Sequence, residues 1–440
     1  MTNADALAGY SPRRTVLDRF LSFFSSVGAG EGAGAILLAL NVFILLGTYY
    51  ILKTVREPLI LNQPGGAEVK SYSAAGQAVL FLLIVPLYGA FASRVNRLWL
   101  ISGVTAFFIS NLAIFFALGT AGVGVGIPYY LWVGIFNMMV VAQFWAFAND
   151  IYTEEQGKRL FPIVGVGASL GAWVGSLSAG YLLEYLGLYQ LMLVAAGLLT
   201  LCIVLTWTVH RRERGRTTEE KAKEAEQPLD RKGGFQLVLR HRYLRLIALL
   251  VLLLNLVNTL GGYLLDQFVI ASAQAIPAAE RGKFIGQFYA DFFSWANLLG
   301  FLIQTFLVAR VFQWIGVRGG LFVLPLIAMA GYGILAVLPI LAIVRVAKIL
   351  ENATDYSLNN TVRHALFLPT SREEKYKGKA ATDTFFVRLG DMFQAGIVFA
   401  GVQLGLSISN LAVVNLVIVG AWLAVAVAIY REHKRLTTEA

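Results

Sequence analysis

The sequence predicts an all-α membrane protein of about twelve transmembrane helices arranged as two six-helix bundles. Three observations lead to this fold class. The 440 residues are 57% hydrophobic and only 14% charged, with a mean hydropathy of +0.66, so they cannot cover a soluble surface with charge. Apolar runs of roughly 18 residues or more, the length that crosses a bilayer, recur along the chain. The two halves also resemble each other in sequence.

Six spans are expected before a polar linker and six after it. The linker, 210–241, contains HRRERGRTTEEKAKEAEQPLDRKGG, which is charged, poor in apolar residues and typical of a mobile connector. It separates a first bundle (33–209) from a second bundle (242–430), with a cytoplasmic amphipathic segment at 1–32 and a cytoplasmic tail at 431–440. The expected spans are 33–53, 72–93, 97–119, 127–149, 160–183, 187–209, 242–270, 284–310, 317–338, 340–366, 380–406 and 409–430.

The charges of the loops predict the orientation in the membrane. The loops near 119–127, 184–189, 337–341 and 405–410 contain no Lys or Arg, whereas basic residues gather at the opposite ends of the spans and in the linker. By the positive-inside rule both termini and the linker are cytoplasmic, in a bilayer such as a bacterial inner membrane. This distribution also accounts for the net charge of +10, so nucleic-acid binding is not expected. The stretch SPRRTVLDRFLSFFSS is expected to form a short helix on the membrane surface.

The internal resemblance is a parallel repeat of six spans. EEQGKRLFPIVGVGASLG, from Glu154, matches EEKYKGKAATDTFFVRLG, from Glu373, and LNVFILLGTY, from Leu40, matches LNLVNTLGGY, from Leu254. Both matches place like-numbered spans of the two halves in register. Two such halves joined by a cytoplasmic linker are typical of transporters that bind solute between the halves and rock.

The repeated charge cluster that follows each fourth span suggests a gate. In the first half it lies within FWAFANDIYTEEQGKRLF, between Phe144 and Phe161. We expect it to close the cytoplasmic ends of the halves against each other, although topology and snorkelling alone would also explain Lys158 and Arg159. The expected gate residues are Asp150, Glu154, Arg159, Glu374 and Lys377.

Ionisable residues within spans are costly, and they usually face a cavity or a partner. In YYILKTVREPLIL, Lys53 and Arg56 share a helix face, and a helix break is expected at Glu57-Pro58. They form either a cationic wall for an anionic solute or a pair of side chains that snorkel at the membrane edge.

The eighth and tenth spans carry polar stripes. GQFYADFFSWANLLG places Gln287, Asp291, Ser294 and Asn297 near one face, which favours a functional acid or, alternatively, interhelical hydrogen bonds. The tenth span has polar residues at steps of three and four, which indicates a water-lined wall, internal ion pairs or both. Those residues are Arg345, Lys348, Asn352, Asp355, Asn359 and Arg363.

Other patterns point away from an enzyme or a cofactor protein. Small residues recur every fourth position in the fifth span, from Gly167 through Gly171 and Gly175, which predicts close helix packing rather than a nucleotide fingerprint. No HExxH, GxSxG or P-loop motif occurs. One cysteine, Cys202, excludes an internal disulfide and disfavours a Cys-based metal site. No metal and no cofactor are expected.

Several motifs resemble those of the non-mitochondrial ATP/ADP translocases, the nucleotide transporters of plastids and intracellular bacteria. FWAFANDIYTEEQGKRLFPIVGVGASLG is similar to their FW-x-FAN stretch followed by T-x-x-EAKR-x-(Y/F)-P-L-F-G-x-GA. YYILKTVREPLIL is similar to the end of their first span, YADFFS to their GDFS, and KYKGKAATDTF to their KGKAAID. The resemblance covers both halves and most of the membrane region.

The resemblance implies a twelve-span, major-facilitator-like exchanger of nucleotides. Some family acids are missing here: Asn258 stands where the family has a glutamate, and Arg363-His364 replaces a Lys-Glu pair. Cations compatible with phosphate persist, so an anionic solute is expected, while ATP/ADP identity and the mode of exchange stay open. The expected substrate-binding residues are Lys53, Arg56, Asn258, Asp291, Arg363 and Lys379, with Arg345, Lys348, Asn352, Asp355, Asn359, Gln287 and Asn297 lining the cavity.

Three functions remain from the sequence. The first is an antiporter of nucleotides or related phosphorylated anions, with Tyr49, Tyr50, Trp145 and Tyr289 as candidate aromatic surface for the base. The second is a proton-coupled transporter of an unrelated solute, working through Asp291, Asp355 or His364. The third is a membrane scaffold or sensor that does not transport. A monomer in the lipid bilayer is the expected assembly.

Overall fold

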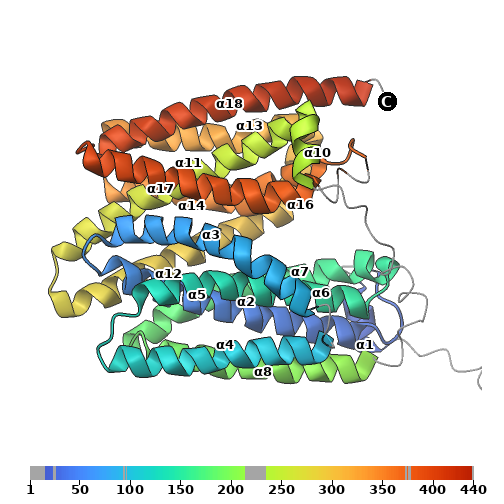
Figure 1. Ribbon diagram of the computed structural model, residues 1–440. Coiled ribbons are helices and arrows are strands. Elements are labelled where there is room, and N and C mark those ends of the chain that lie inside the picture. The colour runs from blue at the N-terminus through green and yellow to red at the C-terminus, as the bar shows by residue number, and fades with distance from the viewer. Residues whose placement is uncertain are drawn as a thin grey trace, which may run out of the picture.

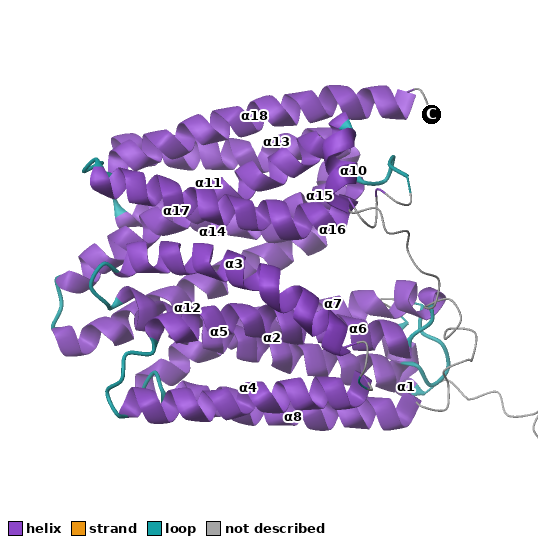
Figure 2. Cartoon of the chain, in the orientation of Figure 1, coloured by secondary structure: helices purple, strands orange, loops and turns teal. Residues whose placement is uncertain are grey.

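In the computed structural model, residues 15–22, 26–92, 95, 97–213, 234–371, 374 and 378–438 are described, and these residues form helices and loops without a strand (Figure 2). The first half of the chain builds α1 (Val16–Leu21), α2 (Gly32–Leu61), α3 (Gly66–Ala92), α4 (Arg97–Thr120), α5 (Gly126–Phe136), the π-helix η1 (Asn137–Val141), α6 (Ala142–Ile151), α7 (Glu154–Tyr185) and α8 (Gln190–Glu213).

The second half builds a matching set of helices. They are α10 (Gly234–Arg240), α11 (Arg242–Gln274), α12 (Ala278–Leu302), the π-helix η2 (Ile303–Leu307), α13 (Val308–Val337), α14 (Leu341–Thr354), the π-helix η3 (Asp355–Asn359), α15 (Asn360–Leu366), α16 (Lys379–Ala381), the π-helix η5 (Thr382–Phe386), α17 (Val387–Gln403) and α18 (Ile408–Thr438). Figure 1 shows the two halves lying one above the other, with α3 and α12 near the plane where they meet.

The number of spans agrees with the expectation of about twelve. Within the described residues, ten helical stretches are long and apolar enough to cross a membrane. One of them, Ala278–Val337, contains two of the expected spans. The backbone turns between these two spans at Gly316, whose φ of 68° lies in the left-handed region that favours glycine. The expected tenth span is also helical, through α14, η3 and α15, and it falls outside the ten because it is rich in charged residues.

The glycines of the fifth span let α7 approach α2 closely, as predicted. A Cβ atom on Gly167 would collide with the backbone of Ala39, one on Gly171 with the backbone of Phe43, and one on Gly175 with the backbone of Gly47. Small residues of this kind bring helix backbones together where lipid offers no hydrophobic drive for association. The packing interpretation of this stripe is therefore confirmed.

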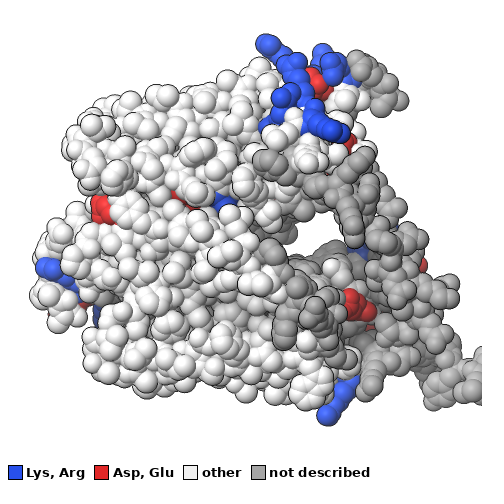
Figure 3. Space-filling model, in the orientation of Figure 1, with Lys and Arg blue, Asp and Glu red and all other residues white. Residues whose placement is uncertain are grey.

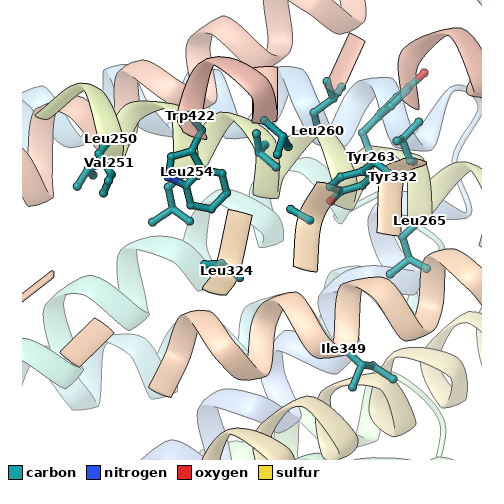
Figure 4. Close-up of a cluster of buried hydrophobic side chains, with 14 of the residues drawn as sticks. Leu250, Val251, Leu254, Leu260, Tyr263, Leu265, Leu324, Tyr332, Ile349 and Trp422 are labelled. Atoms are coloured by element: carbon teal, nitrogen blue, oxygen red, sulfur yellow. The ribbon is translucent and has the colours of Figure 1, made fainter. Parts of the chain in front are cut away.

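Each half has its own apolar core. In the second half, Leu254 and Leu260 of α11 pack with Leu324 of α13 and Trp422 of α18, and all four side chains are buried (Figure 4). Helices α2, α5, α7 and α8 contribute most of the buried residues of the first half's core. The halves meet through α3 against α17 and through α7 and α2 against α12.

Part of the predicted amphipathic N-terminal helix is present as α1, held on the start of α2, while residues 1–14 and 23–25 lie outside the described residues. The Thr15 side chain caps α1 and the Asp18 carboxylate accepts from the backbone N–H of Thr15, a reciprocal capping box. The same carboxylate accepts from Gly30 N–H at 3.0 Å and from Gly32 N–H at 2.9 Å, which satisfies backbone donors at the start of α2. Phe20 stays exposed on the apolar face of α1.

Candidate functional site

A cavity of about 250 Å³ lies between the two halves, and its walls hold a cluster of charges. The first half contributes three cations, Lys53 and Arg56 of α2 and Lys70 of α3, and the second half contributes Lys348 of α14. Two acids, Glu57 of α2 and Asp266 of α11, lie among them. We call this space the cationic cavity. Its other lining residues are Ser71, Ala74, Tyr130, Asn258, Thr259, Gly262, Tyr263, Leu265, Tyr289, Phe292, Phe293, Asn352, Tyr356 and Gln394.

The spacing along α2 delivers both predicted cations of the first span to the cavity. Lys53 Nζ lies 4.2 Å from the centre of the Phe293 ring, and the Arg56 guanidinium lies 4.7 Å from the centre of the Tyr130 ring. Both contacts are cation–π interactions. The helix break predicted at Pro58 is wrong: α2 continues to Leu61, and because Pro58 lies in its last turn only one hydrogen bond is lost.

Lys70 joins the two halves inside the cavity. Its Nζ lies 2.7 Å from Glu57 Oε2 in the first half and 2.8 Å from Asp266 Oδ1 in the second half. Tyr289 donates its hydroxyl to the same Asp266 carboxylate, and Arg56 also pairs with Glu57. Glu57 and Asp266 are buried, so each depends on these cations for compensation of its charge.

More contacts between the halves lie near Lys70. We call the end of the bundle where α8 ends and α10 begins the linker end, and the opposite end the far end. Near the far end, Tyr263 and Gln267 of α11 donate to Glu68 Oε1 of α3, at 2.8 and 2.6 Å. Gln394 of α17 donates to Ser71 Oγ at 3.1 Å. Figure 3 shows the surface hollowed between the halves at the linker end, so the halves are joined at one end and parted at the other.

The polar residues of the tenth span do not all line one cavity. Lys348 and Asn352 line the cationic cavity. Lys348 Nζ donates to the backbone oxygen of Asn258 at 2.9 Å and lies 3.1 Å from Glu351 Oε2. Tyr332 donates its hydroxyl to that same oxygen of Glu351 at 2.6 Å. Within the stripe, Asn359 also donates to Asp355 at 2.7 Å.

Other predicted residues lie outside this cavity. Asp291 and Arg345 form an ion pair on an exposed face of α12 and α14, with the Arg345 guanidinium 5.5 Å from the centre of the Phe288 ring. Gln287 does not line the cationic cavity either. Arg363 pairs with Asp383 at 2.5 Å, and Lys379 Nζ lies 2.8 Å from His364 Nδ1. The structure therefore does not bring Asp291, Arg363 and Lys379 together with Lys53 and Arg56.

The ion pairs of two expected gate residues, Arg159 and Glu374, each lie within one half. Arg159 pairs with Glu31 at 2.9 Å, within the first half. Glu374 lies 3.3 Å from His241, within the second half. Asp150 is exposed at the end of α6. Lys377 and the side chain of Glu154 lie outside the described residues, so the gate stays a prediction.

A second cavity, of about 260 Å³, lies beside the first and shares Tyr356 with it. Among the described residues, its walls carry no charged side chain; amides, hydroxyls and aromatic rings line it, so we call it the amide cavity. Asn297, predicted as a cavity residue, is among them. The described residues that line it are Leu46, Tyr49, Tyr50, Ala168, Ser169, Ala172, Asn297, Gly300, Phe301, Gln304 and Tyr356.

Sequence reasoning missed three charged residues of the cationic cavity. Lys70 lies just before the expected start of the second span, so the sequence places it in a loop. Asp266 lies inside the expected seventh span, where an acid is itself a signal of function. Glu57 was seen only as a neighbour of Arg56 at a helix break. Glu351, behind Lys348, carries the same signal, because it is an acid inside the expected tenth span.

Comparisons with known proteins agree with this architecture. The Major Facilitator Superfamily model matches residues 33–341, and the TLC ATP/ADP transporter model matches residues 311–433. The ADP,ATP carrier protein 1 of Chlamydia trachomatis is 24% identical over 467 residues, covering 88% of this chain and 86% of that protein. The chloroplastic ADP,ATP carrier protein 1 of Arabidopsis thaliana is 26% identical over 351 residues, covering 71% of this chain and 54% of that protein.

Solved structures show the same fold at low identity. The nucleoside transporter NupG is 12% identical with a TM-score of 0.62, over 90% of this chain and 97% of that one. A bacterial homolog of the human lysosomal transporter Spinster, in an inward-facing and unoccupied conformation, is 14% identical with a TM-score of 0.58, over 92% and 97% of the two chains. The chain is therefore a multi-pass membrane transporter that belongs to the Major Facilitator Superfamily, and its second half carries the domain of the TLC ATP/ADP transporters.

Proposed function

We propose that this protein is a secondary antiporter of nucleotides or related phosphorylated anions, which it carries by alternating access through the cationic cavity. The observation that carries the proposal is the placement of Lys53, Arg56, Lys70 and Lys348 around one cavity between the halves. Lys and Arg form charge-assisted hydrogen bonds to phosphate oxygens, which are among the strongest in proteins. Since both halves supply cations, a bound anion would engage both as they rock.

The charges of the cavity favour an anion over a cation or a neutral solute. Four cations face two acids, Glu57 and Asp266, so the lining has an excess of positive charge. The Lys53 ammonium is without a carboxylate partner among the described salt bridges and lies against the Phe293 and Tyr50 rings. An incoming phosphate would supply the missing counter-charge. The relatives named ADP,ATP carrier proteins, in Chlamydia and in chloroplasts, support a nucleotide as that anion.

The setting of this activity follows from the loop charges. We infer a monomer in a bacterial inner membrane, with both termini and the linker cytoplasmic, because Lys and Arg gather at the linker end. The hollow at the linker end then opens to the cytoplasm, and the contacts near Lys70 close the opposite side. We infer that the chain transports its substrate without chemical conversion.

Exchange can be tested in proteoliposomes that hold the purified full-length protein. Uptake of labelled ATP should require ADP inside the vesicles, and Arg56→Ala should abolish it. Arg345→Ala is a matched control, because this arginine pairs with Asp291 on an exposed face away from the cavity. ATP uptake that is equal in empty and ADP-loaded vesicles would contradict exchange, and full activity in Arg56→Ala would contradict the site.

A second function, proton-coupled transport of another solute, is favoured by Glu351. This carboxylate is 1% exposed, and its Oε1 atom has no hydrogen-bond partner among the residues that the structure describes. Lys348, which pairs with Glu351, also lines the cavity. If a bound anion drew Lys348 away, Glu351 would be a buried carboxylate without its cation, and burial would then favour its protonated form. Under this alternative a proton gradient drives uptake into vesicles without internal nucleotide, and Glu351→Gln abolishes that uptake. Under nucleotide exchange, internal ADP is required and a proton gradient does not replace it.

A further inference from the structure

The amide cavity differs from the cationic cavity in chemistry while it adjoins the same space. Tyr356 lines both. The rings of Tyr50, on the amide side, and Phe293, on the cationic side, contact each other edge to face at 6.0 Å between centres. Together the two cavities, of about 250 and 260 Å³, reach the size of small-molecule sites, roughly 300–1,000 Å³. A ligand with an anionic end and an uncharged end could therefore occupy both.

Two π-helical segments build one wall of the amide cavity. Gln304 lies in η2, and Tyr356 lies in η3, and these two segments contact each other. A π-helical turn inserts an extra residue into the helix, and such turns are often found at functional sites. Here both turns carry a side chain that faces the same cavity. Gln304 and Tyr356 therefore both enter the amide cavity from π-helical turns of the second half.

The two amide side chains are positioned from different sides. Asn297 is buried, and its Nδ2 donates to Ser176 Oγ of α7 at 3.2 Å, which orients the amide. Gln304 is exposed, and its Oε1 accepts from Thr361 at 3.4 Å. An amide offers both donor and acceptor atoms, which is the pattern that reads the edge of a nucleobase. Such hydrogen bonds do not require charge, in agreement with a wall that has none.

Aromatic rings of the amide cavity supply the second element of base recognition. Tyr49 and Tyr50 contact each other edge to face at 5.2 Å between centres, and both line the cavity together with Tyr356. Bases stack on aromatic side chains irrespective of their identity. The rings would thus hold any base, and the amides would distinguish among bases.

We propose that the amide cavity is the nucleobase subsite, in which Asn297 and Gln304 read the base edge while the phosphates occupy the cationic cavity. This proposal rests on the proposed nucleotide function and adds the residues that select the base. The tyrosines provide the stacking surface, and Tyr356 marks the boundary between the subsites. Tripolyphosphate, which lacks a base and ribose, would bind to the cationic cavity alone.

Equilibrium binding of ATP and of tripolyphosphate to the detergent-purified protein separates the two subsites. Gln304→Leu and Asn297→Ala should each weaken ATP binding about tenfold, the loss of one to two hydrogen bonds, and leave tripolyphosphate binding unchanged. Lys53→Ala should weaken the binding of both ligands. Gln287→Leu is the matched control, since Gln287 lies on α12 and lines neither cavity. Comparison of ATP with GTP and CTP should show reduced discrimination in Gln304→Leu.

The outcomes distinguish this inference from the function on which it rests. If Lys53→Ala weakens both ligands while Gln304→Leu and Asn297→Ala bind ATP normally, the base lies elsewhere and only the inference fails. Equal weakening of ATP and tripolyphosphate by the amide variants would also overturn it. If the wild-type protein binds neither ligand, the nucleotide function itself fails. Asn297→Ala removes a contact with α7, so Gln304→Leu provides the test should that variant misfold.

Discussion

Asp266→Asn should shift the protein from the conformation seen here towards one that opens at the far end. Asp266 accepts from Lys70 across the halves at 2.8 Å, and we expect this contact to break when the far end opens. Asparagine keeps the shape but removes the charge, and Lys70 retains Glu57 at 2.7 Å, so no cation is stranded. The substitution therefore weakens the Lys70–Asp266 contact between the halves and leaves the Lys70–Glu57 contact within the first half in place.

The magnitude follows from the kind of bond that is lost. A hydrogen bond to a charged group contributes about 1.5–3 kcal/mol. Asparagine keeps an acceptor oxygen, so removal of the charge costs at most this amount, and the ratio of the two conformations should change by up to about tenfold to hundredfold. Glu68 and Ser71 still connect the halves, so we expect the shift to lie near the lower end of that range.

Distances between spin labels measure this shift. The single cysteine, Cys202, would first be replaced by serine. Labels at Val123→Cys and Leu338→Cys report on the far end, where both residues are exposed in loops of different halves. Labels at Thr153→Cys and Ser371→Cys, also exposed, report on the linker end. In Asp266→Asn, the distance between the labels at positions 123 and 338 should lengthen, and the distance between the labels at 153 and 371 should shorten.

The matched control is Asp391→Asn, which also removes a buried acid from the second half. Asp391 accepts from Asn255 at 2.7 Å and pairs with Arg388 at 3.1 Å, so its partners all lie in the same half. Its substitution should leave both distance distributions unchanged. Unaltered distances in Asp266→Asn, or the same shift in Asp391→Asn, would refute the assignment of Lys70–Asp266 as a contact that closes the far end.

Three further predictions concern stability, each measured by thermal unfolding in detergent. Gly171→Ala should destabilise the protein by about 1–3 kcal/mol, because its Cβ meets the backbone of α2, whereas Gly165→Ala, which faces open space, should not. Lys348→Met should cost about 3–5 kcal/mol by stranding Glu351, and adding Glu351→Leu should recover most of it; no recovery would contradict the buried pair. Burial opposes ionisation of Asp18, but hydrogen bonds from backbone N–H groups lower its pKa to about 2, so its contribution is full above about pH 4 and lost as the pH falls through 2. Asp18→Asn should therefore destabilise the protein at pH 7 and have little effect near pH 2, and an equal effect at both would contradict this reasoning.

The position of Asp291 illustrates what the sequence could not predict. Helical spacing predicts that Asp291 and Asn297 lie near one face of α12, yet Asp291 is exposed and only Asn297 lines a cavity between the halves. Ala290 packs towards Gly180 of α7, with 3.1 Å separating its Cβ from the position of a Cβ on that glycine. Ala290 thus faces α7, and the next residue, Asp291, lies about 100° further around the helix and faces outwards. Rotation of a helix depends on its partners, which a single sequence does not reveal.

Lys70 and Asp266 show a second limit. Each is recognisable as a charge at or inside an apolar run, but they are far apart in the chain and in different halves. Their contact depends on how the halves meet and on which end is closed. The expected gate at Glu374 shows the opposite case. The internal repeat predicts that its residues meet across the halves, but the halves are apart at that end in this conformation.

Local chemistry was sufficient to predict the class of protein, about twelve spans in their order and the close packing of α7 on α2, and it offered a cationic wall on α2 as one of two interpretations. Hydropathy, small-residue spacing and residue steps of three and four act within one helix or between neighbours, so they can be read from the chain. The tertiary structure alone decided which polar faces share a cavity, which acids neutralise Lys70, and that an uncharged compartment adjoins the cationic one. Those features arise from the relative rotation and tilt of helices, which many distant contacts determine together.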